Sequence, residues 1–290
     1  MPVSGLLILD KPAGLTSRQV VDRVARIVRP AKAGHAGTLD PLATGVLVVC
    51  VGQATRLIEY VQRMPKTYRA TLLFGRSSPT DDIEGPITLE DTPPVPTGEQ
   101  IVEAATQFIG TIQQRPPDYS AVHVAGRRAY DLARRGVALD LAPRPVEVFE
   151  IRVVSYAYPE LVFEVRCGSG TYVRSIIRDL AAALGTTAVM SALVRAAIGE
   201  FHQADALPLD ALTPDTLIER LLPARSALTQ VPEIAISDEE QLRLVRGQTI
   251  QRPVASGDQE WAAINAAGNL VALLARRVDG SLGPTRVFAT

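Results

Sequence analysis

The chain has 290 residues with a net charge of −1, and 47% of them are hydrophobic. This length favours one large domain with a smaller one, and no apolar run approaches the roughly 20 residues that a membrane-spanning helix needs. Two cysteines and three histidines at unrelated spacings cannot form a local zinc-type cluster, so we expect no metal, no membrane span, and a reduced, cytoplasmic protein.

Charge is unevenly distributed along the chain. Residues 81–103 hold seven acids and no basic residue, whereas residues 11–35 hold one acid and six basic residues: Lys11, Arg18, Arg23, Arg26, Arg29 and Lys32. Phosphate contacts supply most of the affinity of nucleic-acid-binding proteins, so this segregation favours a basic RNA-binding face. Solvated helix faces are the competing interpretation.

The first part of the chain has the pattern of strands alternating with short helices. The apolar run "LLILD" predicts an interior strand, and Thr16 is placed to cap a helix in which valine and isoleucine recur at helical spacing. A glycine-rich loop with Asp40 follows, then strands at 46–51 and 66–74. Alternation along the second of these strands places Tyr68 on its inward face.

The rest of the chain completes a large domain and predicts a second, smaller one. Residues 75–98 indicate a long loop, and Thr97 with Gln100 forms a capping-box pattern that opens a helix through Ile109. Further expected elements are a basic helix ending at Gly136, strands at 146–156, 161–167 and 193–201, and a helix beginning near Val173. Ser237 with Glu240 forms another capping box, which opens a helix that is followed by short strands. We therefore expect a large domain at 1–230 and a small β-rich domain at 231–290.

Asp40 lies in the segment "GHAGTLDPLATGVL". The residue before a proline is pushed toward extended geometry, and Pro41 offers no N–H to the carboxylate. Glycines, Gly37 among them, let the backbone turn sharply and let a ligand approach closely. Asp40 is thus a candidate nucleophile or base, and a turn-forming aspartate that bonds its own backbone is the alternative.

Three further residues have more than one interpretation. Arg174 follows "GSG" at the start of a helix, where it can pair with Asp40, bind a phosphate or lie exposed. Tyr68 is either a core aromatic or a stacking platform for a flipped base, and His35 can contact RNA or bond the loop backbone. The sequence lacks phosphate-loop, dinucleotide-binding, nucleophile-elbow and HExxH motifs, which leaves an acid with basic surroundings and no cofactor.

Distinctive segments occur along the chain, in the order "LDKPAGLTS", "GHAGTLDPLATGVL", "KTYRATLLFG", "QRPPDYSAVHVAGRRAYDLARRG", "GTYVRSIIRDL", "LVRAAIGEF" and "TRVF". In these segments, and over nearly its whole length, the chain resembles the bacterial tRNA pseudouridine-55 synthases, the TruB family. The resemblance implies an α+β fold, in which a pseudouridine synthase domain is built on a mixed, mainly antiparallel central sheet. It also implies a basic insertion around residues 113–136 that grips the T-arm of tRNA, and a small C-terminal PUA-like β domain.

The same resemblance implies an isomerase that converts the T-loop uridine at tRNA position 55 to pseudouridine. It would use no metal or cofactor, and it would act as a monomer without an obligate protein partner. Asp40 is then the catalytic aspartate, Tyr68 stacks on the target base, and Arg174 pairs with the aspartate. The expected RNA-contacting residues are His35, Gly37, Asp82, Tyr172, Lys11, Arg127 and Arg195.

Three positions depart from the family pattern: His123, Ser169 and Val194, where basic residues are common. We therefore expect weaker or differently placed RNA binding with the chemistry intact. Two other functions stay open, namely a guide-RNA-dependent synthase of the same superfamily and a tRNA-folding chaperone in which binding matters more than catalysis. The "QRPPDYSA" insertion favours the stand-alone enzyme.

Overall fold

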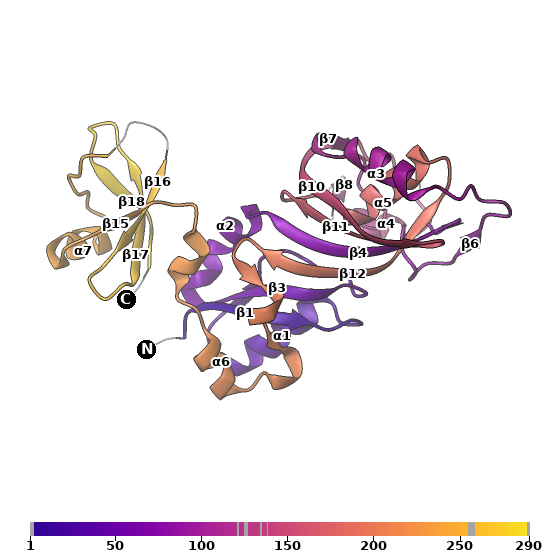
Figure 1. The fold of residues 1–290 in the computed structure, drawn as a ribbon. Helices are drawn as coiled ribbons and strands as arrows, with labels where there is room; N and C mark the ends of the chain where they lie inside the picture. The colour runs from indigo at the N-terminus through magenta and orange to yellow at the C-terminus, as the bar shows by residue number, and fades with distance from the viewer. Residues whose placement is uncertain are drawn as a thin grey trace.

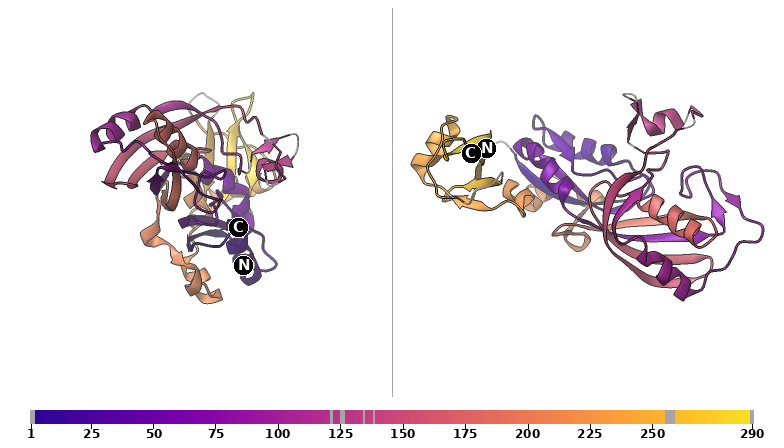
Figure 2. Two further views of the ribbon diagram at one scale, coloured as in Figure 1. Left: turned by 90° about the vertical axis from the view of Figure 1, so that its right-hand side faces the viewer. Right: turned by 90° about the horizontal axis from the view of Figure 1, so that it is seen from above.

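Two β-sheets dominate the computed structural model, which describes residues 3–288 except 121, 125–126, 134, 138 and 255–258. A long central sheet curves through most of the molecule, and the C-terminal residues form a smaller sheet (Figure 1). Seen from above, the smaller sheet projects from one end of an elongated molecule (Figure 2).

The central sheet has ten strands. Eight lie side by side in the order β14 (Leu207–Pro208), β1 (Gly5–Lys11), β3 (Thr44–Val51), β12 (Ala188–Ile198), β4 (Lys66–Phe74), β11 (Glu160–Cys167), β10 (Arg144–Ala157) and β7 (Gly110–Gln114). The other two, β2 (Ala33–His35) and β13 (Phe201–His202), pair with β3 and β12. In the described part of this central sheet only β14–β1 and β3–β12 pair in parallel, so the expected mixed, mainly antiparallel sheet is confirmed.

The parallel contact between β3 and β12, called here the β3–β12 junction, joins two halves of the central sheet. It consists of two residue pairs, Val194 with Thr44 and Arg195 with Gly45. One half is built on β1 and β3, and the other on β12, β4, β11 and β10. The loop that carries Asp40 enters β3 at this junction.

Helices and 3₁₀ segments pack around the two sheets (Figure 1). The α-helices are α1 (Ser17–Ile27), α2 (Ile58–Arg63), α3 (Gly98–Thr106), α4 (Ala129–Ala133), α5 (Val173–Ala183), α6 (Pro214–Arg220) and α7 (Asp238–Val245). The 3₁₀ segments are η1 (Gly52–Leu57), η2 (Gln203–Asp205), η3 (Leu209–Ala211) and η4 (Ala224–Leu228).

Helix α1 begins with the expected cap. The Thr16 hydroxyl accepts the backbone N–H of Gln19, and the Gln19 side chain accepts that of Thr16, which completes a capping box. Its valines pack on β1 and β3, where each buried side chain contributes about 1.5–3 kcal/mol. This packing fixes the rotation of the helix and leaves Arg18, Arg23 and Arg26 exposed on its other face.

Helices α3 and α5 cover the other half of the central sheet. Their apolar side chains join Phe74 and Phe163 of the strands in one buried cluster, to which Ile101, Ile176 and Ile177 belong. The capping box at the start of α3 is confirmed, although the helix ends at Thr106. The cluster packs α5 against the sheet and thereby positions Arg174, which lies in the first turn of α5.

Two expected segments are more structured or shorter than the sequence pattern indicates. The loop at 75–98 contains a two-stranded ribbon of β5 (Arg76–Ser77) and β6 (Thr88–Leu89). In the basic insertion, β8 (His123–Val124) pairs with β9 (Arg127–Arg128), and the helix expected to end at Gly136 is the five-residue α4. The Arg127 side chain lies outside the described part of the structure.

The C-terminal sheet contains β15 (Glu233–Ala235), β16 (Glu260–Ile264), β17 (Leu270–Arg276) and β18 (Leu282–Val287), in that order. Helix α7 starts at the expected capping box, in which the Ser237 hydroxyl accepts the N–H of Glu240. An apolar cluster including Leu244, Trp261 and Leu274 lies between the helix and the sheet.

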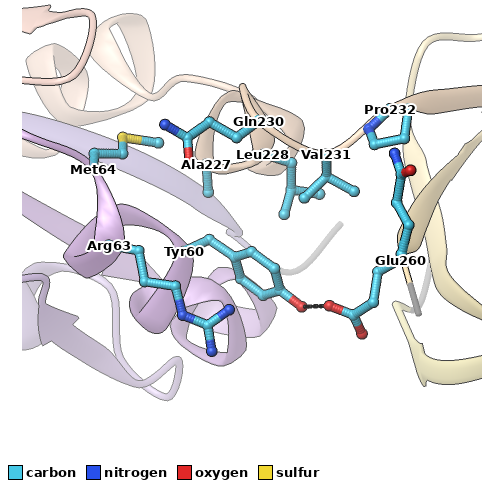
Figure 3. Close-up of a pocket in the computed structure, with 10 residues that line it drawn as sticks. Tyr60, Arg63, Met64, Ala227, Leu228, Gln230, Val231, Pro232 and Glu260 are labelled. Atoms are coloured by element: carbon cyan, nitrogen blue, oxygen red, sulfur yellow. Dashed lines mark hydrogen bonds between the residues drawn. The ribbon is translucent and has the colours of Figure 1, made fainter. Parts of the chain in front are cut away.

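The C-terminal sheet contacts α2 and η1 of the larger part. The Tyr60 hydroxyl donates a hydrogen bond of 2.5 Å to the Glu260 carboxylate (Figure 3). Arg56 donates one of 2.6 Å to the carbonyl of Val287. A hollow of about 280 Å³ lies beside the first contact, lined by Tyr60, Arg63 and residues of the connection at 227–232. None of the expected site residues lines it.

Candidate active site

Asp40 lies on a loop between β2 and β3 that is fastened to the start of α1. The Ser17 hydroxyl accepts the backbone N–H of Leu39 at 2.8 Å and donates to its carbonyl at 3.2 Å. Ser17 and Leu39 are both buried, whereas the Asp40 side chain is 35% exposed. The fold therefore holds the loop backbone firmly and presents the carboxylate at the surface of the site.

Arg174 brings a guanidinium to this carboxylate. Its Nη2 lies 3.0 Å from Oδ2 of Asp40, and its side chain is only 6% exposed. The same guanidinium donates to the carbonyls of Thr80 at 2.8 Å and Tyr119 at 3.0 Å. These further acceptors fix the guanidinium plane, so Asp40 meets a cation whose position does not depend on Asp40 alone.

Asp82 lies on the other side of Arg174, 3.6 Å from Nη1. Its carboxylate accepts the hydroxyl of Thr80 at 2.6 Å and the backbone N–H of Glu84 at 3.1 Å, and its side chain is buried. Asp82, which was expected to contact RNA, is thus bonded within the protein. Asp82 instead supplies a second carboxylate to Arg174, so the buried cation is compensated from two sides.

Tyr68 lies on β4 at the edge of the buried cluster of α3 and α5, and remains partly exposed. It is paired in register with Arg195 of β12 and Val165 of β11. Burial raises the pKa of the Tyr68 phenol, and the positive charge of Arg195 opposes this rise while the charge of Asp40 adds to it. The phenol therefore lies within electrostatic range of both side chains.

Lys11 and Arg195, which were expected to contact RNA, are both buried. Lys11 is 0% exposed, and its Nζ donates to the carbonyls of Pro12, Leu15 and Pro41. Burial lowers the pKa of Lys11 to about 8, against the opposing effect of the Asp40 charge. Both cations bond carbonyls of the protein's own backbone, which for Arg195 are those of Gly37, Thr38 and Val46.

The described residues place no group of three or more His, Cys, Asp and Glu side chains where it could hold a metal ion. Among the same residues, no helix is both long and apolar enough to cross a membrane. Cys50 and Cys167 are buried free thiols, as expected, and burial raises the pKa of each.

Comparison with known proteins identifies the family. The family model described as TruB family pseudouridylate synthase (N terminal domain) matches residues 25–173. The tRNA pseudouridine synthase B of Caulobacter sp. (strain K31) is 45% identical over 303 residues, which cover 99% of this chain and 96% of that protein. That of Dehalococcoides mccartyi (strain ATCC BAA-2266 / KCTC 15142 / 195) is 39% identical, covering 99% of this chain and 97% of that protein. The chain belongs to the TruB family of pseudouridylate synthases.

Solved structures support the same fold. A chain in a structure of an H/ACA RNP bound to a substrate RNA containing 2′-deoxyuridine has a TM-score of 0.75 and 25% identity, covering 99% of this chain and 85% of that one. A chain of a Cbf5-Nop10-Gar1 complex gives a TM-score of 0.74 at 24% identity, covering 98% and 85%. The expected pseudouridine synthase fold, and with it an isomerase of the TruB family, is confirmed.

Three expected RNA-contacting residues of this TruB chain remain near the surface. His35 on β2 and Tyr172 before α5 are partly exposed, and so is Gly37, whose φ of +117° suits glycine. Burial lowers the pKa of His35, and no described residue bonds its Nδ1. The Tyr172 ring lies against the Arg144 guanidinium at 5.2 Å.

Of the three departures from the TruB pattern, Ser169 is exposed in the turn before α5 and Val194 is partly buried at the β3–β12 junction. The side chain of His123 lies outside the described residues. Only Ser169 is therefore seen at a position where a basic residue would reach solvent directly.

The sequence interpretation missed one ion pair beside the site. Arg178, one helical turn beyond Arg174, lies 3.2 Å from Asp81, next to Asp82 in the chain. Two adjacent acids thus face two arginines spaced by one turn of α5. The adjacent acids and the i, i+4 spacing of the two arginines are both visible in the sequence, and together they could have predicted this ion pair.

Proposed function

We propose that this chain isomerises the T-loop uridine at position 55 of tRNA to pseudouridine, with Asp40 as the nucleophile. The observation that carries the proposal is the 3.0 Å contact between Asp40 and the buried guanidinium of Arg174, while the Asp40 side chain stays 35% exposed. One side of the carboxylate meets a fixed cation, and the other can meet a substrate. A turn-forming aspartate at the surface would not require a buried arginine behind it.

The reaction balances without a co-reactant. The C1′–N1 bond of the uridine breaks, a C1′–C5 bond forms, the C5 proton leaves, and N1 gains a proton. A carboxylate oxygen can add to the sugar carbon, as in retaining glycosidases, or to the pyrimidine ring, and Asp40 serves either route. The TruB relatives named above are tRNA pseudouridine synthases, which favours tRNA as the substrate.

Tyr68 takes the role of stacking partner for the flipped base. A uridine in a folded loop must leave its stack before Asp40 can reach it, which costs a few kcal/mol. Stacking on an aromatic ring returns about 1–3 kcal/mol per base. Tyr68 is partly exposed and within electrostatic range of Asp40, so its ring can offer this contact.

The exposed arginines of α1 supply a surface for the RNA backbone. Arg18, Arg23 and Arg26 face solvent on the helix whose first residue, Ser17, bonds the loop of Asp40. Phosphate contacts there would orient the T-arm toward the site. We assign residues 1–230 to the catalytic domain and 231–290 to a PUA-like RNA-binding domain, with the basic insertion on the T-arm.

The remaining parts of the proposal concern the RNA contacts and the setting. His35, Gly37 and Tyr172 contact the T-loop from the rim of the site, since each is partly exposed. The enzyme acts in the cytoplasm as a monomer, without a metal, a cofactor or an obligate protein partner.

Tritium release tests the proposal. The purified chain is incubated with a T-arm stem-loop that contains uridine labelled with tritium at C5, and the modified position is mapped by sequencing. We expect release from the wild type and a loss of about 10⁴-fold or more in Asp40→Asn, because the amide cannot act as the nucleophile. Asp22→Asn, which replaces an exposed acid of α1, is the matched control and should react like the wild type.

Each rival function gives a different result. A chaperone would keep its effect on tRNA folding in Asp40→Asn, and a guide-dependent enzyme would release tritium only after a guide RNA is added. Release from Asp40→Asn within tenfold of the wild type would exclude Asp40 as the nucleophile, and modification outside the T-loop would exclude the proposed substrate.

A further inference from the structure

Arg195 occupies the β3–β12 junction, where the two halves of the central sheet meet. Its backbone pairs with Gly45 of β3 on one side and with Tyr68 of β4 on the other. A register shift in the β12–β4 pairing follows at once, between Arg195 and Ala197. Such bulges re-aim side chains next to active sites, so the chain direction at Arg195 is set by local backbone geometry.

The guanidinium of Arg195 bonds the backbone of the catalytic loop. Its Nε donates to the carbonyl of Val46 at 2.7 Å, Nη2 to that of Gly37 at 3.1 Å, and Nη1 to that of Thr38 at 3.4 Å. Thr38 lies two residues before Asp40. One side chain of β12 therefore connects the strand that follows Asp40 to the loop that precedes it.

This arginine is unlike the other buried arginine of the site. The Arg195 side chain is 1% exposed, and among the described residues no carboxylate lies within ion-pair distance of it, whereas Arg174 has Asp40 and Asp82. Burying a charge without a counter-ion is costly, and it is tolerated only where hydrogen bonds satisfy the group. The forked donors of a guanidinium can reach several carbonyls at once, which an apolar side chain of equal volume cannot.

Two glycines, Gly37 and Gly45, let the backbone pack closely against Arg195. Gly45 has a φ of +98°, and a Cβ there would lie 2.3 Å from the carbonyl oxygen of Arg195. A Cβ on Gly37 would lie 3.5 Å from Nη1. At Gly45, β3 and β12 thus lie too close together for a side chain to fit between their backbones. At Gly37, the loop backbone packs against the guanidinium of Arg195.

We propose that Arg195 is a positioning residue that holds the Asp40 loop at a fixed place relative to Tyr68. Replacing it would leave both side chains present while their mutual geometry loosens. This inference rests on the proposed roles of Asp40 and Tyr68. The positive charge of Arg195 also opposes the rise in the Tyr68 phenol pKa that burial causes. Arg195 therefore influences both Tyr68 and the loop of Asp40.

The test compares Arg195→Met and Arg195→Lys with Arg152→Gln, a control that removes an exposed strand arginine paired with Glu164. Turnover and KM are measured with the tritiated T-arm stem-loop. We expect Arg195→Met to lower kcat about 10²-fold, the size of loss that a misplacement of about 1 Å causes, while KM changes less than about threefold. Arg195→Lys should lie between Arg195→Met and the wild type, because an ammonium keeps some of the donors. The control should match the wild type.

Amide hydrogen exchange gives a readout that does not depend on activity. In Arg195→Met we expect faster exchange of the loop at 36–43, with exchange in β10 and β11 unchanged, and Arg195→Lys covers the case in which the methionine variant does not fold. A kcat within threefold of the wild type, equal losses in both variants, or faster exchange throughout the sheet would overturn the inference. If the wild type released no tritium while the loop still loosened, the proposed function would fail and the positioning contact would stand.

Discussion

The two sheets of this protein bury different kinds of side chain. Among the described residues, the buried charged side chains are Lys11, Lys66, Asp82, Arg174 and Arg195, and all belong to the larger part. In the C-terminal sheet the buried polar residue is Ser281, and the rest of its core is apolar. Burying a charge costs several kcal/mol before compensation, so the apolar sheet shows what packing alone requires. Four of these five side chains, Lys11, Asp82, Arg174 and Arg195, bond the Asp40 loop or the arginine that pairs with Asp40, so most of the buried charge is gathered around the candidate site. Lys66 instead bonds the carbonyls of Gln62 and Met64.

The most severe way to break this contrast is to remove the buried cation that touches Asp40. Arg174→Met leaves Asp82 buried without its cation and deprives Asp40 of its partner. We expect the rate of tritium release to fall about 10³-fold, or about 4 kcal/mol in the activation free energy. Single-turnover release from the T-arm stem-loop measures this loss.

Arg178→Met is the matched control for that variant. Arg178 lies one turn further along α5 and pairs with Asp81 and Asp179 rather than with Asp40. Its replacement should cost less than about tenfold in rate, since partly exposed ion pairs contribute little. Equal losses in the two variants would mean that α5 needs both arginines for packing, and that proximity to Asp40 has no special effect.

The apolar sheet should respond in the opposite way. Leu274→Ala removes a fully buried side chain of β17 that packs with Trp261 and Leu244, so the free energy of unfolding should fall by about 3 kcal/mol. Turnover of the stem-loop well below the unfolding temperature should stay within about twofold. Chemical denaturation and tritium release on the same sample measure both quantities.

Leu242→Ala supplies the control for the apolar sheet, because Leu242 is exposed on α7. It should change the free energy of unfolding by less than about 0.5 kcal/mol. If Leu274→Ala lowered turnover as strongly as Arg174→Met, the C-terminal sheet would take part in positioning the site, and the contrast between the two parts would not hold.

The same contrast separates what the sequence predicts from what it does not. Two capping boxes, the cap at Thr16 and the strand with Tyr68 follow from local patterns, because a cap or an alternating strand is encoded within a few residues. The proximity of Asp40 and Arg174 was implied by the family resemblance, because the residues alone left a phosphate or solvent as other partners of Arg174. Helix ends and the short helix of the basic insertion were less predictable, since tertiary contacts decide them.

The burial of Lys11 and Arg195 could not be predicted for a different reason. Their acceptors are backbone carbonyls, of Pro41 for Lys11 and of Val46, 149 positions away in the chain, for Arg195. Every residue type presents the same carbonyl, so no sequence pattern identifies the partner. An isolated basic residue in a motif therefore suggests a surface contact with RNA, and only the fold shows that it serves the backbone.

The buried charge of Lys11 can be tested through the pH dependence of the unfolding free energy. Burial lowers its pKa to about 8 in the folded protein, from 10.5, so between these values the unfolded state binds more protons and stability rises with pH. The difference in unfolding free energy between the wild type and Lys11→Met should shift by about 2 kcal/mol in favour of the wild type from about pH 7 to about pH 9.5.

Taking the difference between two variants cancels the titration of Cys50 and Cys167, whose raised pKa values favour unfolding as the pH rises. Arg152→Gln should show no such shift against the wild type. A constant difference between the wild type and Lys11→Met over this range would show that the lysine stays charged in the folded protein, and that its three carbonyl acceptors fully offset its burial.

The smallest expected effect lies where the two parts meet. Tyr60→Phe removes the hydrogen bond to Glu260, and burial together with this carboxylate raises the pKa of the Tyr60 phenol to about 12. We expect the free energy of unfolding to fall by about 1 kcal/mol with turnover unchanged, as chemical denaturation and tritium release can show. Tyr158→Phe, at an exposed turn, should change neither quantity. A fall in turnover without a fall in stability would mean that the hydrogen bond aligns the C-terminal sheet on the RNA, because a purely structural contact would affect stability first.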